Sequence, residues 1–131
     1  GEIKGHLGSV YSANFSPDGK LIVTAGADRT ARIWDSSGKF LTELKGHTDT
    51  VWSANFSPDS QQIVTASEDK TARVWDLSGK ELIVLSGHED TVWSANFSPD
   101  GQKVVTASVD RIGRVWDLEG RLLAKLQQHT D

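Results

Sequence analysis

Short runs of apolar residues, separated by polar turns, extend along the whole chain in a pattern typical of β-strands. Residues 10–15 (VYSANF) carry aromatic and β-branched side chains and predict a strand. Residues 21–25 (LIVTA) are almost continuously apolar, which predicts a central strand covered on both faces. Residues 31–35 (ARIWD) and 40–44 (FLTEL) mix apolar and charged positions and predict a third strand and an outer edge strand. Because turns follow every eight to twelve residues, we expect four antiparallel strands and no helix.

The first of these strands deviates from strict alternation. In its second copy, Val51 is out of phase with Ala54 and Phe56. One extra residue, a β-bulge around Trp52 and Ser53, would place all three on the core side. The Ser-Pro-Asp sequence that follows predicts a tight hairpin turn, because Pro presets the second turn position and Asp bonds its own backbone.

The whole pattern recurs three times at an interval of 41 residues. The second and third copies are identical at 26 of 41 positions, which indicates recent duplication or engineering. Each copy is too small to bury its own apolar faces, so its neighbours must cover them. We therefore divide the chain into an outer-strand stub (residues 1–5), three repeat units that we call blades (6–46, 47–87 and 88–128) and a C-terminal tail (129–131).

The repeated residues resemble the WD40 repeat of β-propellers. Gly46-His47 opens the second unit, Asp69 lies six residues before Trp75, and Trp75-Asp76 ends its third strand. The resemblance covers essentially the whole chain and implies an all-β propeller with three four-stranded antiparallel blades. It says little about function, because WD40 proteins are scaffolds for many unrelated partners.

Three blades are too few to close a ring of ordinary curvature, so the chain is expected to form a homo-oligomer. Cyclic symmetry allows a six-bladed dimer or a nine-bladed trimer, with about 60° or 40° per blade against about 51° in a seven-bladed ring. A tighter ring would push the inner strands into one another, whereas a wider one only enlarges the channel. We favour the trimer for that reason.

An imidazole, a hydroxyl, a carboxylate and an indole recur in fixed register in each unit. These four residue types invite comparison with a catalytic triad, but three identical triads in one small chain are implausible. The WD40 resemblance instead implies a buried structural tetrad in which Asp bonds His, His bonds Thr and Thr bonds Trp. Ser67 is an alternative to Thr65, although the first unit keeps Thr24 and has Gly26 in place of the serine. The predicted tetrads are His6, Thr24, Asp28 and Trp34; His47, Thr65, Asp69 and Trp75; and His88, Thr106, Asp110 and Trp116.

One aromatic position recurs on the innermost strand, as Tyr11, Trp52 and Trp93. At a bulge, these side chains would point to the rim of the central opening, where the family tends to grip peptides. They therefore define a candidate rim for binding a protein or peptide partner. The alternative is that the rings pack against neighbouring strands.

Two further polar positions recur, and the third unit departs from the others beside one of them. We expect three asparagines to line the channel, namely Asn14, Asn55 and Asn96. We expect three arginines to be solvated, namely Arg32, Arg73 and Arg114. Next to Arg114, Ile112 and Gly113 stand where the second unit has a threonine and an alanine, a change expected to weaken the strand slightly.

Composition narrows the function classes. The net charge of −4 and the lack of a basic run argue against nucleic acid and anionic membranes as partners. The chain has no cysteine, and one histidine per unit does not make a metal site, so neither metal nor cofactor is expected. No apolar segment is long enough to be a signal or a membrane span, which favours a cytoplasmic protein. The lack of methionine suggests that Gly1 follows a cleaved tag or a cut from a longer propeller.

We therefore expect a non-catalytic, self-assembling propeller module, with a peptide-binding scaffold as the alternative.

Overall fold

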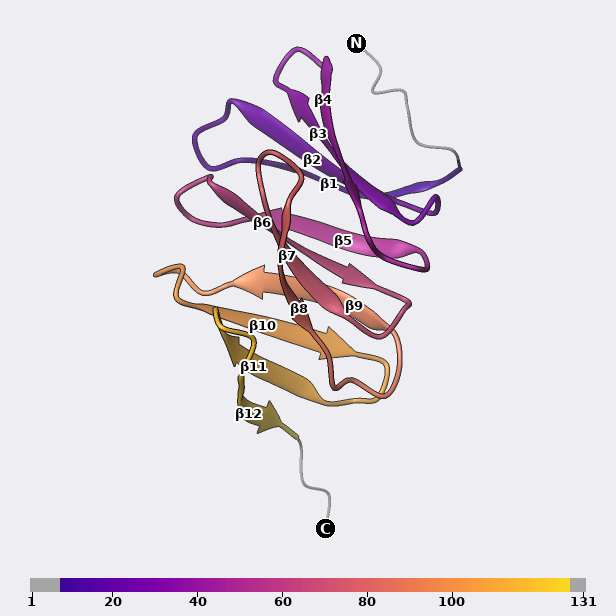
Figure 1. Cartoon of the computed structure of the whole chain (residues 1–131), viewed down its shortest axis with the longest axis vertical. Helices are drawn as coiled ribbons and strands as arrows, with labels where there is room; N and C mark the ends of the chain where they lie inside the picture. Colours follow the sequence, from indigo (N-terminus) through magenta and orange to yellow (C-terminus); the bar gives the residue numbers. More distant parts are fainter. Residues whose placement is uncertain (1–7, 128–131) are drawn as a thin grey trace.

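The computed structural model describes residues 8–127, and within them the protein is all-β (Figure 1). Each blade is one antiparallel sheet of four strands in sequence order, as predicted. Blade 1 contains β1 (Val10–Phe15), β2 (Leu21–Gly26), β3 (Thr30–Asp35) and β4 (Phe40–Lys45). Blade 2 contains β5 (Val51–Phe56), β6 (Gln62–Ser67), β7 (Ala72–Asp76) and β8 (Glu81–Leu85). Blade 3 contains β9 (Val92–Phe97), β10 (Lys103–Ser108), β11 (Gly113–Asp117) and β12 (Leu122–Leu126).

The bulge predicted in the first strand of each unit is confirmed. In blade 2 the β5–β6 register shifts between Val51 and Ser53, so Trp52 has no partner in the ladder. Val51 and Ala54 are consequently both fully buried. A second irregularity lies between the third and fourth strands of every blade, and the sequence pattern did not predict it.

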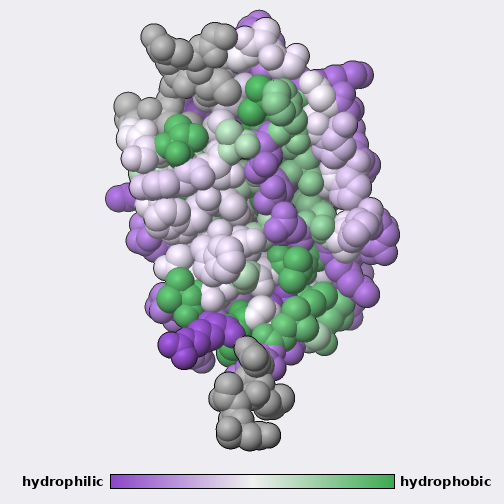
Figure 2. Space-filling view, turned by 180° about the vertical axis from the view of Figure 1, so that it is seen from behind, coloured by the Kyte–Doolittle hydropathy of each residue, from purple (hydrophilic) through white to green (hydrophobic). Residues whose placement is uncertain are grey.

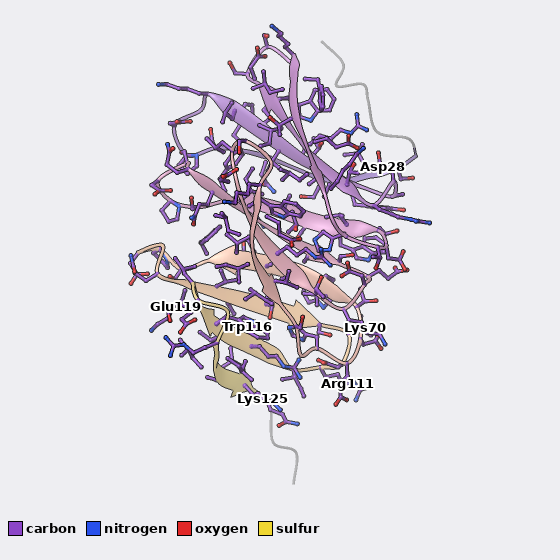
Figure 3. The ribbon with its side chains drawn as sticks, in the orientation of Figure 1. Asp28, Lys70, Arg111, Trp116, Glu119 and Lys125 are labelled. Atoms are coloured by element: carbon purple, nitrogen blue, oxygen red, sulfur yellow. The ribbon has the colours of Figure 1, made fainter. Side chains whose placement is uncertain are left out.

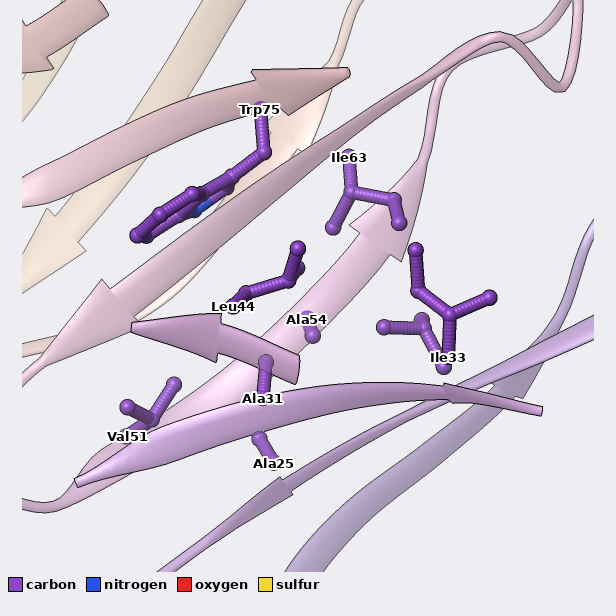
Figure 4. Close-up of a cluster of buried hydrophobic side chains, with 9 residues drawn as sticks. Ala25, Ala31, Ile33, Leu44, Val51, Ala54, Ile63 and Trp75 are labelled. Carbon is purple, nitrogen blue, oxygen red and sulfur yellow. The ribbon is translucent and has the colours of Figure 1, made fainter. Parts of the chain in front are cut away.

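The hydrophobic core lies between the blades rather than inside any one of them. The first cluster joins blade 1 side chains such as Ile33 and Leu44 to Val51, Ile63 and Trp75 of blade 2 (Figure 4). The second cluster repeats this arrangement between blades 2 and 3. Each blade thus covers one face of the next, as a repeat protein requires.

The central strand is more deeply buried in blade 2 than in blade 3. Five of the six residues of β6 are buried, because blade 2 has a blade on either side. In β10 buried and exposed residues alternate, and Val105 is 39% exposed. The prediction of a strand covered on both faces therefore holds for blade 2 but not for blade 3 in the single chain.

Candidate functional sites: the polar tetrads and the aromatic rim

The four tetrad residues of blade 2 lie together at one end of the sheet. His47 precedes β5, Thr65 lies in β6, Asp69 lies in the β6–β7 turn and Trp75 lies in β7. The distance from His47 Nδ1 to Asp69 Oδ2 is 2.8 Å, and that from His47 Nε2 to Thr65 Oγ1 is 2.6 Å. The Trp75 indole N–H donates to Thr65 Oγ1 at 2.9 Å. The contacts form one continuous chain, in the order that the family resemblance implied.

The carboxylate at the start of this chain is held in its ionised form. Burial by itself raises the pKa of Asp69, but hydrogen bonds from His47 and Thr71 outweigh this effect and hold the pKa well below its usual range. An ionised carboxylate only accepts, so His47 Nδ1 carries the hydrogen and Nε2 accepts from the Thr65 hydroxyl. Every polar group in this series of hydrogen-bonded side chains then has a partner. Thr65 is fully buried and its hydroxyl is engaged on both sides, which does not suit a nucleophile.

Ser67 lies apart from the histidine. Its hydroxyl donates to the Thr50 carbonyl at 2.8 Å and accepts from the Asp69 backbone N–H at 3.1 Å. The structure therefore places Thr65 rather than Ser67 against His47.

The tetrad of blade 1 can be compared with that of blade 2 only in part. His6 lies outside the described residues. In blade 1 the Trp34 indole donates to Thr24 Oγ1 at 2.9 Å, and Asp28 accepts from the Thr30 hydroxyl at 2.8 Å. The turns that carry the tetrad aspartates lie along one side of the molecule, as the labelled Asp28, Lys70 and Arg111 indicate (Figure 3).

Blade 3 keeps the contacts among histidine, threonine and tryptophan but changes the contact between histidine and aspartate. His88 Nε2 lies 2.6 Å from Thr106 Oγ1, and the Trp116 indole donates to the same oxygen at 2.9 Å. Asp110 Oδ2, however, is 3.6 Å from His88 Nδ1. The guanidinium of Arg114 donates from Nη1 to both of these groups and lies between them.

The expectation that the three arginines are solvated is wrong. The side chains of Arg32 and Arg73 are 17% and 15% exposed, and that of Arg114 is 3% exposed. Arg32 lies over the Phe40 ring, with its guanidinium carbon 5.4 Å from the ring centroid, and pairs with Glu43.

The substitutions around each arginine explain where it points. Arg73 donates to Thr71 Oγ1 at 3.2 Å and to Glu81 Oε1 at 2.7 Å. The equivalent residues of blade 3 are Ile112 and Leu122, which cannot accept a hydrogen bond. Arg114 therefore turns inward to the aspartate and the histidine. A position-by-position comparison of the two units would have given this signal.

The asparagines of the first two blades connect neighbouring blades, a contact that was not part of the prediction that they line a channel. Asn14 Nδ2 donates to the Ala54 carbonyl at 2.9 Å, and Asn55 Nδ2 donates to the Ala95 carbonyl at 2.9 Å. Each hydrogen bond therefore crosses from one blade to the next. Asn96, in the last blade, is exposed and lies 3.3 Å from Ser94 Oγ in its own strand.

The aromatic rim positions combine packing with exposure. The ring centroids of Tyr11 and Trp52 are 4.4 Å apart, as the packing alternative requires. Tyr11 is nevertheless 45% exposed and Trp93 is 54% exposed, whereas Trp52 is partly buried. The indole N–H of Trp52 is buried without a hydrogen-bond partner.

Collisional quenching with iodide is expected to separate the five tryptophans. Trp93 should be quenched readily and Trp52 in part, while the fully buried Trp34, Trp75 and Trp116 should be protected. The Trp93→Phe variant should lose most of the quenchable fluorescence, and Stern–Volmer plots of both proteins measure the difference. An unchanged quenchable fraction in that variant would contradict the exposed rim.

Nowhere in residues 8–127 do three or more acidic or imidazole side chains gather closely enough to hold a metal ion. The same residues contain no helix that is long and apolar enough to cross a membrane.

Comparison with known proteins agrees with this geometry. The family model described as "WD domain, G-beta repeat" matches residues 1–35, 38–76 and 79–117. The chain belongs to the WD40 repeat family. The second match contains β4 and the first three strands of blade 2, so the matched unit links two neighbouring sheets.

Individual relatives match over one repeat only. The chain is 53% identical over 30 residues to transcription initiation factor TFIID subunit 5 of Caenorhabditis elegans, covering 23% of this chain and 5% of that protein. It is 50% identical over 34 residues to telomerase protein component 1 of Rattus norvegicus, covering 26% of this chain and 1% of that protein.

Proposed function

We propose that this chain is a non-catalytic WD40 module that assembles head to tail with copies of itself into a closed propeller ring. The main observation in support is that the two end faces of the chain are the two halves of a blade junction that already occurs twice inside it. The occupant of each end face is a second copy of the chain, because the complementary half lies on the opposite end.

One half is the outer face of blade 3. In blade 2, the side chains that contact the following blade include Val64 and Leu85, both fully buried. Their equivalents one unit later, Val105 and Leu126, are 39% and 52% exposed. Figure 2 shows apolar side chains gathered at the blade 3 end of the molecule. We call this surface the trailing face; it consists of Val105, Ala107, Val115 and Leu126.

The other half is the outer face of blade 1, here named the leading face and defined by Val10, Ala13, Phe15 and Ile22. The residue equivalent to Val10 is fully buried in blades 2 and 3, whereas Val10 itself is 47% exposed. Phe56 and Phe97 pack partly buried against the two cores, whereas Phe15 is 65% exposed.

A polar pair supports the same match. Ala54 and Ala95 accept the asparagine hydrogen bonds of the preceding blades and are fully buried. The equivalent acceptor at the start of the chain is Ala13, and the equivalent donor at its end is Asn96, and both are exposed. Joining two copies would continue the series with one Asn96-to-Ala13 hydrogen bond per junction.

The nine-bladed trimer is favoured over the six-bladed dimer. The Tyr11 and Trp52 rings are already in contact at a centroid distance of 4.4 Å. A dimer needs a sharper turn between blades, which would force these inner-strand rings together. A trimer separates them and enlarges the channel.

Light scattering coupled to size exclusion tests the proposal. The expected mass is about 43 kDa, three times the 14.3 kDa of one chain. A mass of about 29 kDa would show a dimer instead, and a monodisperse species of 14.3 kDa would overturn self-assembly.

A matched pair of variants locates the interface. Val105→Asp places a carboxylate on the trailing face and should give a folded monomer, because an unpaired charge there would be desolvated on association. Val109→Asp introduces the same change at a residue that is 55% exposed and outside both faces, and should leave the mass unchanged. Equal masses for the two variants would contradict the assignment of the face.

The exposure of Trp93 favours a second candidate function, a protein- or peptide-binding scaffold that uses the rim of Tyr11, Trp52 and Trp93. The partly buried Trp52 ring supports the exposed Tyr11 ring, with 4.4 Å between the ring centroids. Selection from a random peptide display library tests it. Peptides retained by the protein and lost by Trp93→Ala would support a rim site, and retention of the same peptides by both would exclude it.

A further inference from the structure

We propose that the contact between Arg114 and His88 makes blade 3 the acid-sensitive blade of this protein. Blades 2 and 3 hold the same histidine, threonine and tryptophan at the same distances. They differ in the group that faces Nδ1 of the histidine. That difference decides which ring nitrogen carries the hydrogen and whether the buried ring can accept another proton.

In blade 2 a carboxylate faces the ring. Asp69 Oδ2 lies 2.8 Å from His47 Nδ1, and Thr71 donates to the other carboxylate oxygen at 2.6 Å. Arg73 donates to Thr71 and Glu81, and its guanidinium is 3.7 Å from Asp69 Oδ2. His47 is therefore the Nδ1–H tautomer, and the charged group that faces this ring is a carboxylate rather than a cation.

In blade 3 a guanidinium faces the ring. Arg114 Nη1 donates to His88 Nδ1 and to Asp110 Oδ2, the latter at 2.9 Å. A guanidinium has no acceptor, so Nδ1 must accept and the ring hydrogen must lie on Nε2. Nε2–H then donates to Thr106 Oγ1 at 2.6 Å, and the Thr106 hydroxyl points to the Arg114 carbonyl at 3.5 Å. His88 is thus the opposite tautomer from His47.

Protonating His88 in place would be unfavourable. The proton would have to attach to Nδ1, which would remove the acceptor of Arg114 and create two neighbouring cations. Both side chains are buried, at 0% and 3% exposure, so water cannot screen the repulsion. Of the described charged groups, Arg114 and Asp110 are those that act on the ring. Burial first, and then the charge of Arg114, lower the pKa of His88, and Asp110 opposes this only in part.

The sign of the pH effect follows from linkage. A histidine in the opened blade takes up a proton near its ordinary pKa of 6.5, while the closed blade takes one up only at lower pH. The contribution of His88 to stability is therefore complete above that pH and is lost as the pH falls below it. At pH 5.5 the opening equilibrium constant of blade 3 should be higher than at pH 7.5 by up to about tenfold.

The carboxylates do not contribute in this window. The pKa values of Asp69 and Asp110 are both lowered: burial raises each, but hydrogen bonds outweigh it. A group of this kind loses its stabilising effect only as the pH falls below its ordinary value of 3.8. A change between pH 7.5 and 5.5 therefore reports on histidine.

Two measurements on the full chain test the inference without any substitution. Long-range proton–nitrogen NMR spectra of the histidine side chains at pH 7.5 should assign the Nε2–H tautomer to His88 and the Nδ1–H tautomer to His47. Hydrogen exchange followed by mass spectrometry, corrected for intrinsic rates, should show exchange of β10 and β11 accelerated by up to about tenfold at pH 5.5, through a larger opening equilibrium constant, with a smaller change in β6 and β7. The same tautomer for both rings, or equal acceleration in both blades, would overturn the proposal.

A reciprocal exchange of residues assigns the effect to the arginine. The Ile112→Thr/Leu122→Glu variant gives blade 3 the outward partners of Arg73, so His88 should become the Nδ1–H tautomer and the acid acceleration of β10 and β11 should fall. The Thr71→Ile/Glu81→Leu variant should extend the acceleration to β6 and β7, while β10 and β11 keep it. Acceleration that persists in β10 and β11 of the first variant and does not appear in β6 and β7 of the second would exclude Arg114 as its cause. The test does not depend on self-assembly, because exchange within each blade is compared in the same molecule.

Discussion

Leu85→Ala is expected to lower the free energy of unfolding by about 2–5 kcal/mol, because it leaves a cavity in a fully packed site. Leu85 ends the outer strand β8, is fully buried and belongs to the cluster between blades 2 and 3. Leu126 is the equivalent residue in blade 3 and is 52% exposed. Leu126→Ala in the isolated chain should therefore cost well below about 1 kcal/mol. Urea unfolding at concentrations low enough to give a single chain measures both values.

The same pair reports on assembly when the concentration is raised. If copies join through the trailing and leading faces, Leu126 becomes buried, and Leu126→Ala should then raise the dissociation constant by at least about tenfold. Leu85→Ala should alter the stability of the chain at every concentration. A Leu126→Ala protein that associates as tightly as the unmodified chain would contradict the proposed junction.

Local features of this fold could be predicted from the sequence because their causes are local. The alternation of side chains specified the strands, and the Ser-Pro-Asp sequences specified the hairpins. The bulge was visible because Val51 and Ala54 must both be buried although their spacing in the strand puts them on opposite faces. In each case the physical constraint lies within about six residues of chain, so the sequence contains it directly.

The features that were missed or mispredicted depend on residues far apart in the chain. The sequence did not predict that Asn55 donates to the carbonyl of Ala95 in the next blade. Arg114 was expected to be solvated, yet it is buried because Ile112 and Leu122 offer it no acceptor. Period and alternation describe which face a residue occupies, but not which polar group in a neighbouring strand or blade completes its hydrogen bonds.

The tetrad could be predicted only in part. Its residues could be selected from the sequence because they recur in register, but their order of contact came from the family resemblance. The structure adds that blade 3 does not have the same chain of contacts as blade 2, since Arg114 separates Asp110 from His88. Identical residue types at identical spacing therefore do not guarantee the same histidine tautomer.

Thr65→Val is expected to lower the free energy of unfolding by about 2–5 kcal/mol, because one hydroxyl serves two buried groups. Val has nearly the same shape as Thr, so packing changes little, while Trp75 Nε1–H and His47 Nε2 both lose their partner. Neither can reach water, since Trp75 is fully buried and the His47 side chain is 1% exposed. Thr42→Val is the matched control, because the Thr42 hydroxyl makes only a 3.5 Å contact with the Leu77 carbonyl.

A double-mutant cycle separates the two lost contacts. Trp75→Phe removes the indole donor, so the combined Thr65→Val/Trp75→Phe variant should be less destabilised than the sum of its single changes, by about 1 kcal/mol or more. Chemical denaturation of the four proteins gives the coupling free energy when the slope of the unfolding free energy against denaturant concentration is the same for all four. Strict additivity, together with a Thr65→Val cost no larger than that of Thr42→Val, would show that the hydroxyl is not the centre of the buried chain. A positive coupling would instead show that the indole stabilises blade 2 through the Thr65 hydroxyl, and the cost of Thr65→Val that remains in the Trp75→Phe background would report the contact with His47.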